Sequence, residues 1–118
     1  MAPSRDEVTV RRMAEALGLT VLAGSASLDR PISGALVSDL LSYVMASGRG
    51  GNVWITIQTH ANTVAVAALA GLAAIVVGAG FEPGVDTLSR AEEEEIPLLA
   101  SSEPAYALAG QLFELGVR

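Results

Sequence analysis

Apolar positions near the start of the chain follow the period of an amphipathic helix. From Val10 to Leu17, apolar side chains recur three or four positions apart, which predicts a helix with one buried face. Thr9 precedes this pattern and is a favourable N-cap residue, while Gly18 follows it and is a favourable stop. The first helix is therefore expected to run from just after Thr9 to Leu17.

An unbroken apolar run at residues 73–77 predicts a strand that is buried on both faces. Residues 53–57 are the most clearly indicated strand, because they are rich in β-branched side chains. Three shorter strands are expected at residues 20–23, 32–37 and 97–100. Helical patterns predict further helices at residues 40–46, 61–70 and 85–95, and a last helix from near Pro104 to Gly116.

The second half of the chain therefore alternates strand and helix three times. This alternation predicts a parallel sheet with right-handed crossovers. We expect an α/β fold with three layers, in which helices cover both faces of a mainly parallel sheet of about five strands. A chain of 118 residues fits a single domain, and 51% hydrophobic residues are too many for a disordered segment.

The composition excludes several kinds of chemistry. Cysteine is absent, which excludes disulfides, thiolate zinc sites and cysteine nucleophiles. All seven basic residues are arginine, so neither a phosphate-loop lysine nor a Schiff-base lysine exists. His60 is the single histidine, so one chain has no multi-histidine metal site. We expect no metal or cofactor, and the net charge of −6 argues against nucleic-acid binding.

Two segments bear on the cellular location. Residues 1–7 lack the apolar core of a signal peptide, which favours a cytoplasmic protein. Residues 63–81 are uncharged and long enough on paper to cross a bilayer. They are mostly Ala, Val and Gly, however, and a buried helix followed by a buried parallel strand explains them better.

Ligands of open α/β sheets bind beyond the carboxyl ends of the strands. The loops that leave those ends feed helix N-termini, where free N–H groups and the helix dipole favour an anion. Arg30 or Arg49 could locally offset the negative net charge, so a nucleotide or another small anionic ligand is a possible partner. The candidate ligand-binding residues are Ser38, Asp39, Thr59, His60, Asn62, Gly78, Ala79, Gly80, Ser101 and Ser102.

Simpler interpretations of the same residues stay open. Ser, Thr, Asn and Asp at helix starts usually act only as caps. Gly78 and Gly80 lack the rest of a dinucleotide-binding fingerprint and suit a turn with positive φ. His60 could form a hydrolytic triad with Ser38 and Asp39, although no nucleophile-elbow motif is present. The acidic run at residues 92–95 is expected to be a solvated helix face.

Three segments together resemble the DRTGG domain family: residues 53–60, residues 72–83 and residues 91–99. Residues 10–19 also fit, so the resemblance covers nearly the whole chain. More distantly, the chain is similar to the N-terminal domain of HPr kinase/phosphorylase, a domain without the kinase's phosphate loop. No kinase activity is therefore implied.

The resemblance implies a regulatory module without catalytic activity. Family members lie beside CBS domains in regulated pyrophosphatases and at the N-terminal side of phosphotransacetylases, and small stand-alone members occur near iron-hydrogenase genes. An accessory role to a metabolic or hydrogenase-type enzyme is implied, with that enzyme as a possible partner. The chain departs from the family pattern, because His60-Ala61 stands near the expected Asp-Arg and Gly78-Ala79-Gly80 replaces Thr-Gly-Gly.

The helix at residues 40–46 is apolar nearly all round, more than one buried face requires. A twofold homodimer would cover such a surface, with Tyr43, Met45 and Trp54 as contact residues. Alternatively, strands and the last helix of the same chain cover it. A small hydrolase that uses His60 and a purely structural dimerisation domain are the rivals to the regulatory module.

Overall fold

A five-stranded sheet forms the centre of the computed structural model, which describes residues 7–118. Four strands are parallel, and one edge strand is antiparallel to its neighbour. The spatial order is β2 (Thr20–Ala23), β7 (Leu98–Ala100), β6 (Ala74–Val77), β5 (Asn52–Thr56) and β4 (Gly34–Val37). The mainly parallel sheet expected from the sequence is thus confirmed.

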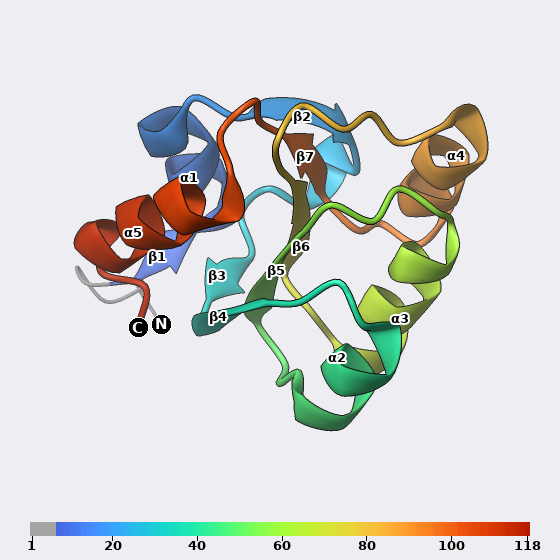
Figure 1. The fold of residues 1–118 in the computed structure, drawn as a ribbon, viewed down its shortest axis with the longest axis horizontal. Helices are drawn as coiled ribbons and strands as arrows, with labels where there is room; N and C mark the ends of the chain where they lie inside the picture. Colours follow the sequence, from blue (N-terminus) through green and yellow to red (C-terminus); the bar gives the residue numbers. More distant parts are fainter. Residues whose placement is uncertain (1–6) are drawn as a thin grey trace.

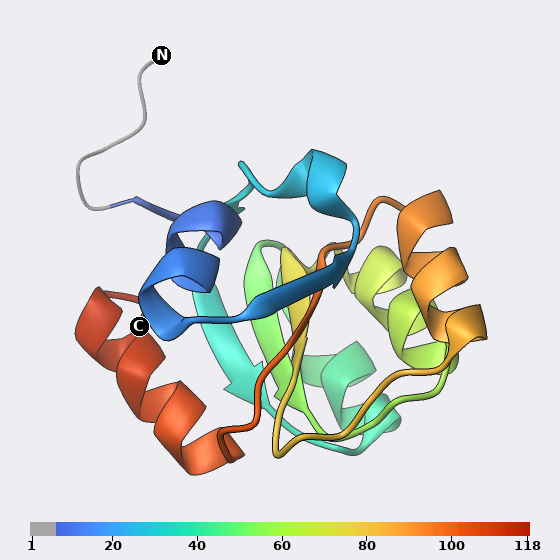
Figure 2. The ribbon, with the colours of Figure 1, turned by 90° about the horizontal axis from the view of Figure 1, so that it is seen from above.

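Helices cover both faces of this sheet (Figures 1 and 2). Two helices pack on one face around a core that includes Met13 and Leu112, and three pack on the other around Trp54 and Ile75. The first pair is α1 (Val10–Leu17) and α5 (Ala105–Leu115), and the second group is α2 (Leu41–Ser47), α3 (Asn62–Ala70) and α4 (Val85–Glu93). The three-layer α/β architecture is therefore as predicted.

Local sequence signals set the ends of two helices. The side chain of Thr9 accepts a hydrogen bond from the backbone N–H of Arg12 at 3.1 Å and caps α1. Gly71 ends α3 in the left-handed conformation, with φ +68°. The backbone N–H of Leu72 then donates to the carbonyl oxygen of Ala67 at 2.9 Å and that of Gly71 donates to Ala68 at 3.3 Å, as in a Schellman motif.

The single strand predicted at residues 32–37 is wrong, because the chain changes partners in the middle of it. β3 (Pro31–Ile32) pairs with β1 (Val8–Thr9) in a separate antiparallel ribbon, whereas β4 pairs with β5. Between them, Ser33 donates its N–H to the carbonyl oxygen of Gly51 and its hydroxyl to that of Gly50. These bonds turn the chain from one sheet into the other.

Trp54 is a core residue, so its prediction as a dimer contact is wrong. Its side chain is 0% exposed, and its Nε1 donates to the carbonyl oxygen of Ser38 at 2.7 Å. A parallel strand in the middle of a three-layer sheet is covered on both faces, which leaves no surface for the indole. Tyr43 and Met45 on α2 remain exposed, at 51% and 47%.

The acidic run is more than a solvated surface. α4 ends at Glu93, and Glu95 takes a positive φ of 57°. The Oε1 atom of Glu92 accepts a hydrogen bond from the backbone N–H of Gly24 at 2.7 Å, which ties α4 to the end of β2.

Within residues 7–118, no helix combines the length and the hydropathy that a membrane span requires.

Candidate functional site

Parallel pairing brings the loops that follow β4, β5, β6 and β7 to one edge of the sheet, here called the carboxyl edge. Residues predicted to bind a ligand occur in all four loops or in the first turn of the helix that follows. The amides and side chains of these loops decide what the edge can bind, since a ligand needs groups that are not already bonded.

Asp39 closes the end of β4 against the end of β5. Its Oδ1 accepts a hydrogen bond from the buried hydroxyl of Thr56 at 2.8 Å and another from the N–H of Ile57 at 2.9 Å. The neighbouring Ser38 hydroxyl accepts from the N–H of Leu40 at 3.1 Å. Both predicted ligand residues therefore form local contacts that hold the loop.

His60 acts as a cap for α3. Its Nδ1 accepts a hydrogen bond from the N–H of Asn62 at 3.0 Å, and its carbonyl oxygen accepts from the hydroxyl of Thr63 at 2.8 Å. An accepting Nδ1 places the proton of the neutral imidazole on Nε2. The exposed ring of His60 can therefore donate one hydrogen bond outward.

The Ser-His-Asp constellation is not assembled in this structure. A triad requires the aspartate to hold the histidine and the histidine to reach the hydroxyl. Instead, Asp39 bonds to Thr56 and Ile57, and His60 bonds to the backbone at the start of α3.

The loop after β6 uses its amides within the protein. The N–H of Ala79 donates to the carbonyl oxygen of Glu103 at 2.7 Å, and that of Gly80 donates to Ser101 at 3.0 Å. Ala79 and Gly80 have positive φ values of 58° and 78°, so the turn interpretation describes this loop. Gly78 is needed for close packing, because a Cβ there would lie 3.0 Å from the Glu103 carbonyl oxygen.

Two cavities open at the carboxyl edge. The larger, about 460 Å³, lies between the β5–α3 loop and the start of α4, and its lining residues are Thr59, His60, Ala61, Gly84, Val85, Asp86 and Thr87. The smaller, about 180 Å³, is lined by Thr20, Gly80, Phe81, Glu82, Ala100, Ser101 and Ser102. The structure thus places only part of the predicted set at these cavities: Thr59 and His60 line the larger, and Gly80, Ser101 and Ser102 line the smaller. The other predicted residues line neither cavity: Ser38, Asp39, Asn62, Gly78 and Ala79.

The start of α4 is a part of the larger cavity that sequence reasoning missed. The hydroxyl of Thr87 is buried and donates to the carbonyl oxygen of Thr59 at 2.7 Å, which joins α4 to the β5–α3 loop. The sequence shows a threonine in the first turn of this helix. It does not show that Thr59, 28 positions away, is the hydrogen-bond partner, because that pairing depends on the crossover between β5 and β6.

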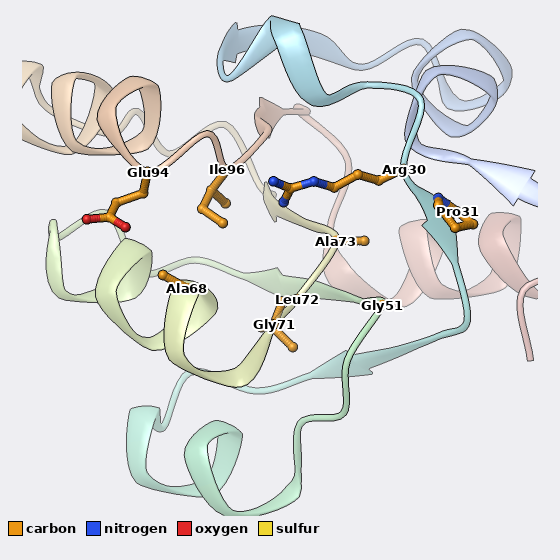
Figure 3. A pocket seen from close by; sticks show the side chains of 9 residues that line it. All are labelled: Arg30, Pro31, Gly51, Ala68, Gly71, Leu72, Ala73, Glu94 and Ile96. Carbon is orange, nitrogen blue, oxygen red and sulfur yellow. The ribbon is translucent and has the colours of Figure 1, made fainter.

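The arginines expected to attract an anion to this edge lie elsewhere. Arg30 lines a cavity with Gly51 and Ala73, which directly precede β5 and β6 and therefore mark the opposite, amino edge (Figure 3). Arg49 lies two residues before Gly51, in the loop that enters β5. The predicted role of these two arginines at the carboxyl edge is wrong. In a parallel sheet, the segments that precede the strands lie at one edge and the segments that follow the strands lie at the other.

Acidic side chains line both carboxyl-edge cavities. Asp86 lines the larger cavity and Glu82 lines the smaller cavity. Neither set of lining residues includes an arginine. At this edge, hydrogen bonds from amides and from His60 would have to recognise a ligand, because none of these lining residues is an arginine or a lysine.

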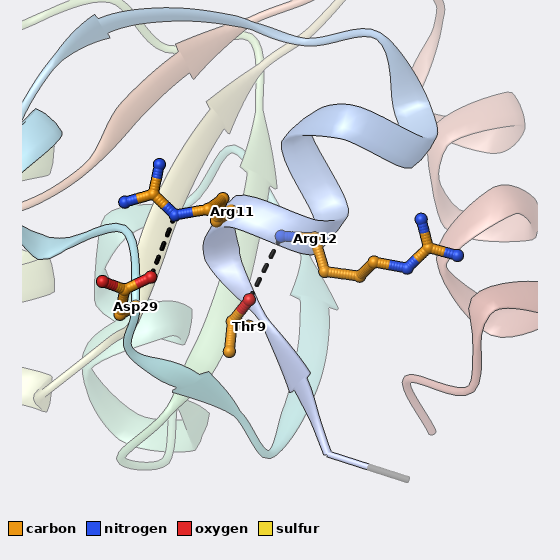
Figure 4. A network of polar contacts seen from close by, with 4 residues as sticks. All are labelled: Thr9, Arg11, Arg12 and Asp29. Atoms are coloured by element: carbon orange, nitrogen blue, oxygen red, sulfur yellow. Dashed lines mark hydrogen bonds and ion pairs between the residues drawn. The ribbon is translucent and has the colours of Figure 1, made fainter. Parts of the chain in front are cut away.

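Arg11 serves the structure of its own region. Arg11 Nε donates to Asp29 Oδ1 at 2.9 Å, which joins α1 to the turn before β3 (Figure 4). This hydrogen bond and the positive charge of Arg11 lower the pKa of Asp29 below its ordinary value.

Among residues 7–118, no group of three or more acidic or histidine side chains could hold a metal ion.

These elements define an α/β fold with two small cavities at the carboxyl edge of its sheet, each lined by one acidic side chain. The solved structures with this fold include the CBS and DRTGG domains of the regulatory region of Clostridium perfringens pyrophosphatase, complexed with its activator diadenosine tetraphosphate. The TM-score is 0.74 at 11% sequence identity, and the match covers 91% of this chain and 46% of that chain. This chain therefore spans about half the length of that structure.

The likeness establishes a DRTGG-like fold, and family membership stays a prediction. No protein-family model matches the sequence, and no curated protein matches it either.

Proposed function

We propose that this chain is a regulatory module that binds a small ligand and has no catalytic activity. The observation that carries this proposal is the bonding at the carboxyl edge. Ser38, Asp39 and His60 each bond to groups that shape the loops, and an open cavity of about 460 Å³ lies beside His60. The shared fold with a regulatory region that was complexed with an activator supports the same proposal.

The ligand class that we propose is a nucleotide or a similar small anion. The structural neighbour was complexed with diadenosine tetraphosphate, which makes adenine nucleotides the first probes. We expect His60 Nε2 and the N–H groups in the first turn of α4 to be the donors on the two sides of the cavity, since both segments line it. Because Asp86 lines the same cavity, a nucleotide should bind better as its Mg²⁺ complex than as the bare polyanion.

A thermal-shift titration tests the binding. Diadenosine tetraphosphate and ATP, each with and without Mg²⁺, should raise the Tm, because a ligand that binds only the native state stabilises it by about 2.7 kcal/mol at 100 times its Kd. His60→Ala should weaken the shift, whereas Arg49→Gln at the opposite edge should leave it unchanged. A flat response to every nucleotide would overturn the ligand class and favour a purely structural module.

The same samples test the absence of catalysis. Hydrolysis of ATP or diadenosine tetraphosphate is expected to stay at the background rate. Turnover that disappears in His60→Ala would instead establish the hydrolase that the sequence left open.

We propose a homodimer through α2 as the second function of the module. Leu40 is 63% exposed, Tyr43 51% and Met45 47%, and Val37 at the end of β4 is 50% exposed. Apolar side chains gathered on one helix and its preceding strand are typical of an interface. Light scattering should therefore give about twice the 12.1 kDa of one chain, and the double variant Tyr43→Ser, Met45→Ser should return it to the mass of a monomer. A wild-type mass near 12.1 kDa would refute the dimer.

The proposed setting follows from the family resemblance. A cytoplasmic accessory domain of a metabolic or hydrogenase-type enzyme would transmit the presence of its ligand to that enzyme. Purified candidate enzymes should then change activity with nucleotide only when this chain is present.

A further inference from the structure

A cavity of about 500 Å³ lies at the amino edge of the sheet, on the side opposite the loops discussed above. Gly51 and Ala73, which directly precede β5 and β6, line it together with Leu72 and Ile96. Its volume falls within the range of about 300–1,000 Å³ that is usual for small-molecule sites. Neither the carboxyl-edge proposal nor the dimer proposal uses this cavity.

Arg30 supplies the positive charge of this amino-edge cavity. Its side chain is half-buried and extends across the cavity towards Ile96, as Figure 3 shows. No carboxylate among residues 7–118 lies within ion-pair distance of Arg30, since the two ion pairs found there join Arg11 to Asp29 and Arg90 to Glu94. Within residues 7–118 the guanidinium thus forms no ion pair, and its N–H donors face the cavity (Figure 3).

The walls around Arg30 are apolar and offer few other donors. Leu72, Ala73 and Ile96 are core residues that expose only small parts of their surface here. The backbone N–H of Gly51 donates to the carbonyl oxygen of Gly71, and that of Ala73 donates to Asn52. A ligand in this cavity would thus find one charged fork and an apolar wall.

Glu94 limits the charge that the cavity accepts. Its carboxylate lies at the far side of the cavity from Arg30, 3.9 Å from Arg90 (Figure 3). A second negative charge on the ligand would be repelled by this carboxylate and would find no second cation in the lining. One negative charge and an apolar body fit these surroundings, and the planar guanidinium matches a carboxylate with two parallel hydrogen bonds.

We propose that the amino-edge cavity binds a small monocarboxylate with an apolar body, held through its carboxylate by Arg30. The body lies against Ala68, which is partly exposed, and Ile96. This site is independent of nucleotide binding at the carboxyl edge, so either site can fail without the other.

The test is an NMR titration of the full chain labelled with ¹⁵N. The probe is 4-methylpentanoate, and the matched neutral probe is 4-methylpentanamide, which has the same body without the charge. The carboxylate should produce saturable shifts at the amides of Gly51, Gly71 and Ala73, and the amide should bind at least ~10-fold more weakly because it lacks the charge-assisted bond.

Two arginine variants locate the charge. Arg30→Gln should abolish the saturable shifts, while Arg49→Gln, which removes an exposed arginine near the same edge, should retain them. Arg30→Lys keeps the charge and loses the planar fork, so it should bind at least ~10-fold more weakly than wild type. The amide spectra of these variants without ligand show whether each is folded, and Arg30→Lys serves as the test if Arg30→Gln is not.

Four results would overturn the proposal. The first is the absence of saturable shifts with 4-methylpentanoate, and the second is equal binding of the carboxylate and its amide. The third is wild-type affinity in a folded Arg30→Gln protein. The fourth is an affinity for inorganic phosphate equal to that for the carboxylate, which would show a bare anion site without the apolar contact.

Discussion

Gly24 is the position where a single added methyl group should be most damaging. It connects β2 to the 3₁₀ turn η1 (Ser25–Ser27) and has a φ of +73°, in the left-handed region. A Cβ there would overlap the carbonyl oxygen of Ile96 and would lie 2.7 Å from the Cα of Pro97. These are backbone atoms in the segment that leads into β7, so they cannot move aside as a flexible side chain would.

The expected cost of Gly24→Ala has two parts. Placing an L-residue in the left-handed conformation costs roughly 1–2 kcal/mol. Forcing a methyl group into a packed region typically costs a further 1–3 kcal/mol. We expect a total loss of about 3 kcal/mol in the free energy of unfolding, a large share of the 5–15 kcal/mol that is typical of a domain.

Gly18→Ala is the matched control, because it has the strain without the overlap. Gly18 has a φ of +65°, and nothing lies within 4 Å of a Cβ added there. This variant should lose about 1 kcal/mol, from the backbone conformation alone. The difference between the two variants then measures the contact with Ile96 and Pro97.

Urea unfolding followed by tryptophan fluorescence provides the measurement. Trp54 is the single tryptophan and is fully buried, so its emission reports global unfolding. Both variants should keep the wild-type m-value. If Gly24→Ala lost no more than about 0.5 kcal/mol beyond Gly18→Ala, the difference would lie within the usual range for a neutral substitution and the close approach would be refuted.

Three further substitutions test single contacts. Thr9→Ala removes the cap of α1 and should lower the free energy of unfolding by about 1 kcal/mol, measured by urea unfolding; an unchanged midpoint would contradict the cap. Trp54→Phe leaves the Ser38 carbonyl oxygen without its donor and a void in the core, so circular dichroism should show a loss of about 2–4 kcal/mol. Asp29→Asn should lower the Tm at neutral pH, because Arg11 holds the pKa of Asp29 below its ordinary value. Because the folded-state pKa of Asp29 is lowered, the ionised carboxylate stabilises the wild-type protein at pH values above the ordinary carboxyl pKa. This stabilisation is lost as the pH falls through the folded-state pKa, so the Tm values of wild type and variant should converge in acid. A Tm difference that stayed constant down to strongly acidic pH would show that the pair is not responsible.

The carboxyl edge shows how far sequence patterns reach for a functional site. The rule that ligands bind beyond the ends of parallel strands pointed to Thr59 and His60, which do line a cavity there. The same rule could not show that the amides of Ala79 and Gly80 are already bonded to the loop after β7. Those bonds join segments more than 20 positions apart, and no local pattern encodes them.

The two arginines show the same limit for charge. Arg30 and Arg49 precede strands, so the topology sends them to the amino edge, away from the loops that they were expected to serve. The sequence gives the net charge directly. It does not show at which edge of the sheet each arginine lies, and the attraction of an anion depends on that distance through space.

The helices and the central strands of the sheet were determined by the sequence, because their causes are local. Helix and strand periods follow from which side chains must be buried, and the stops at Gly18 and Gly71 follow from the left-handed conformation that glycine adopts easily. Tertiary structure alone decided that the chain changes sheets at Ser33 and that Trp54 is enclosed. Each of these depends on which distant segments pack together, and that choice is made by burial and hydrogen bonding over the whole fold.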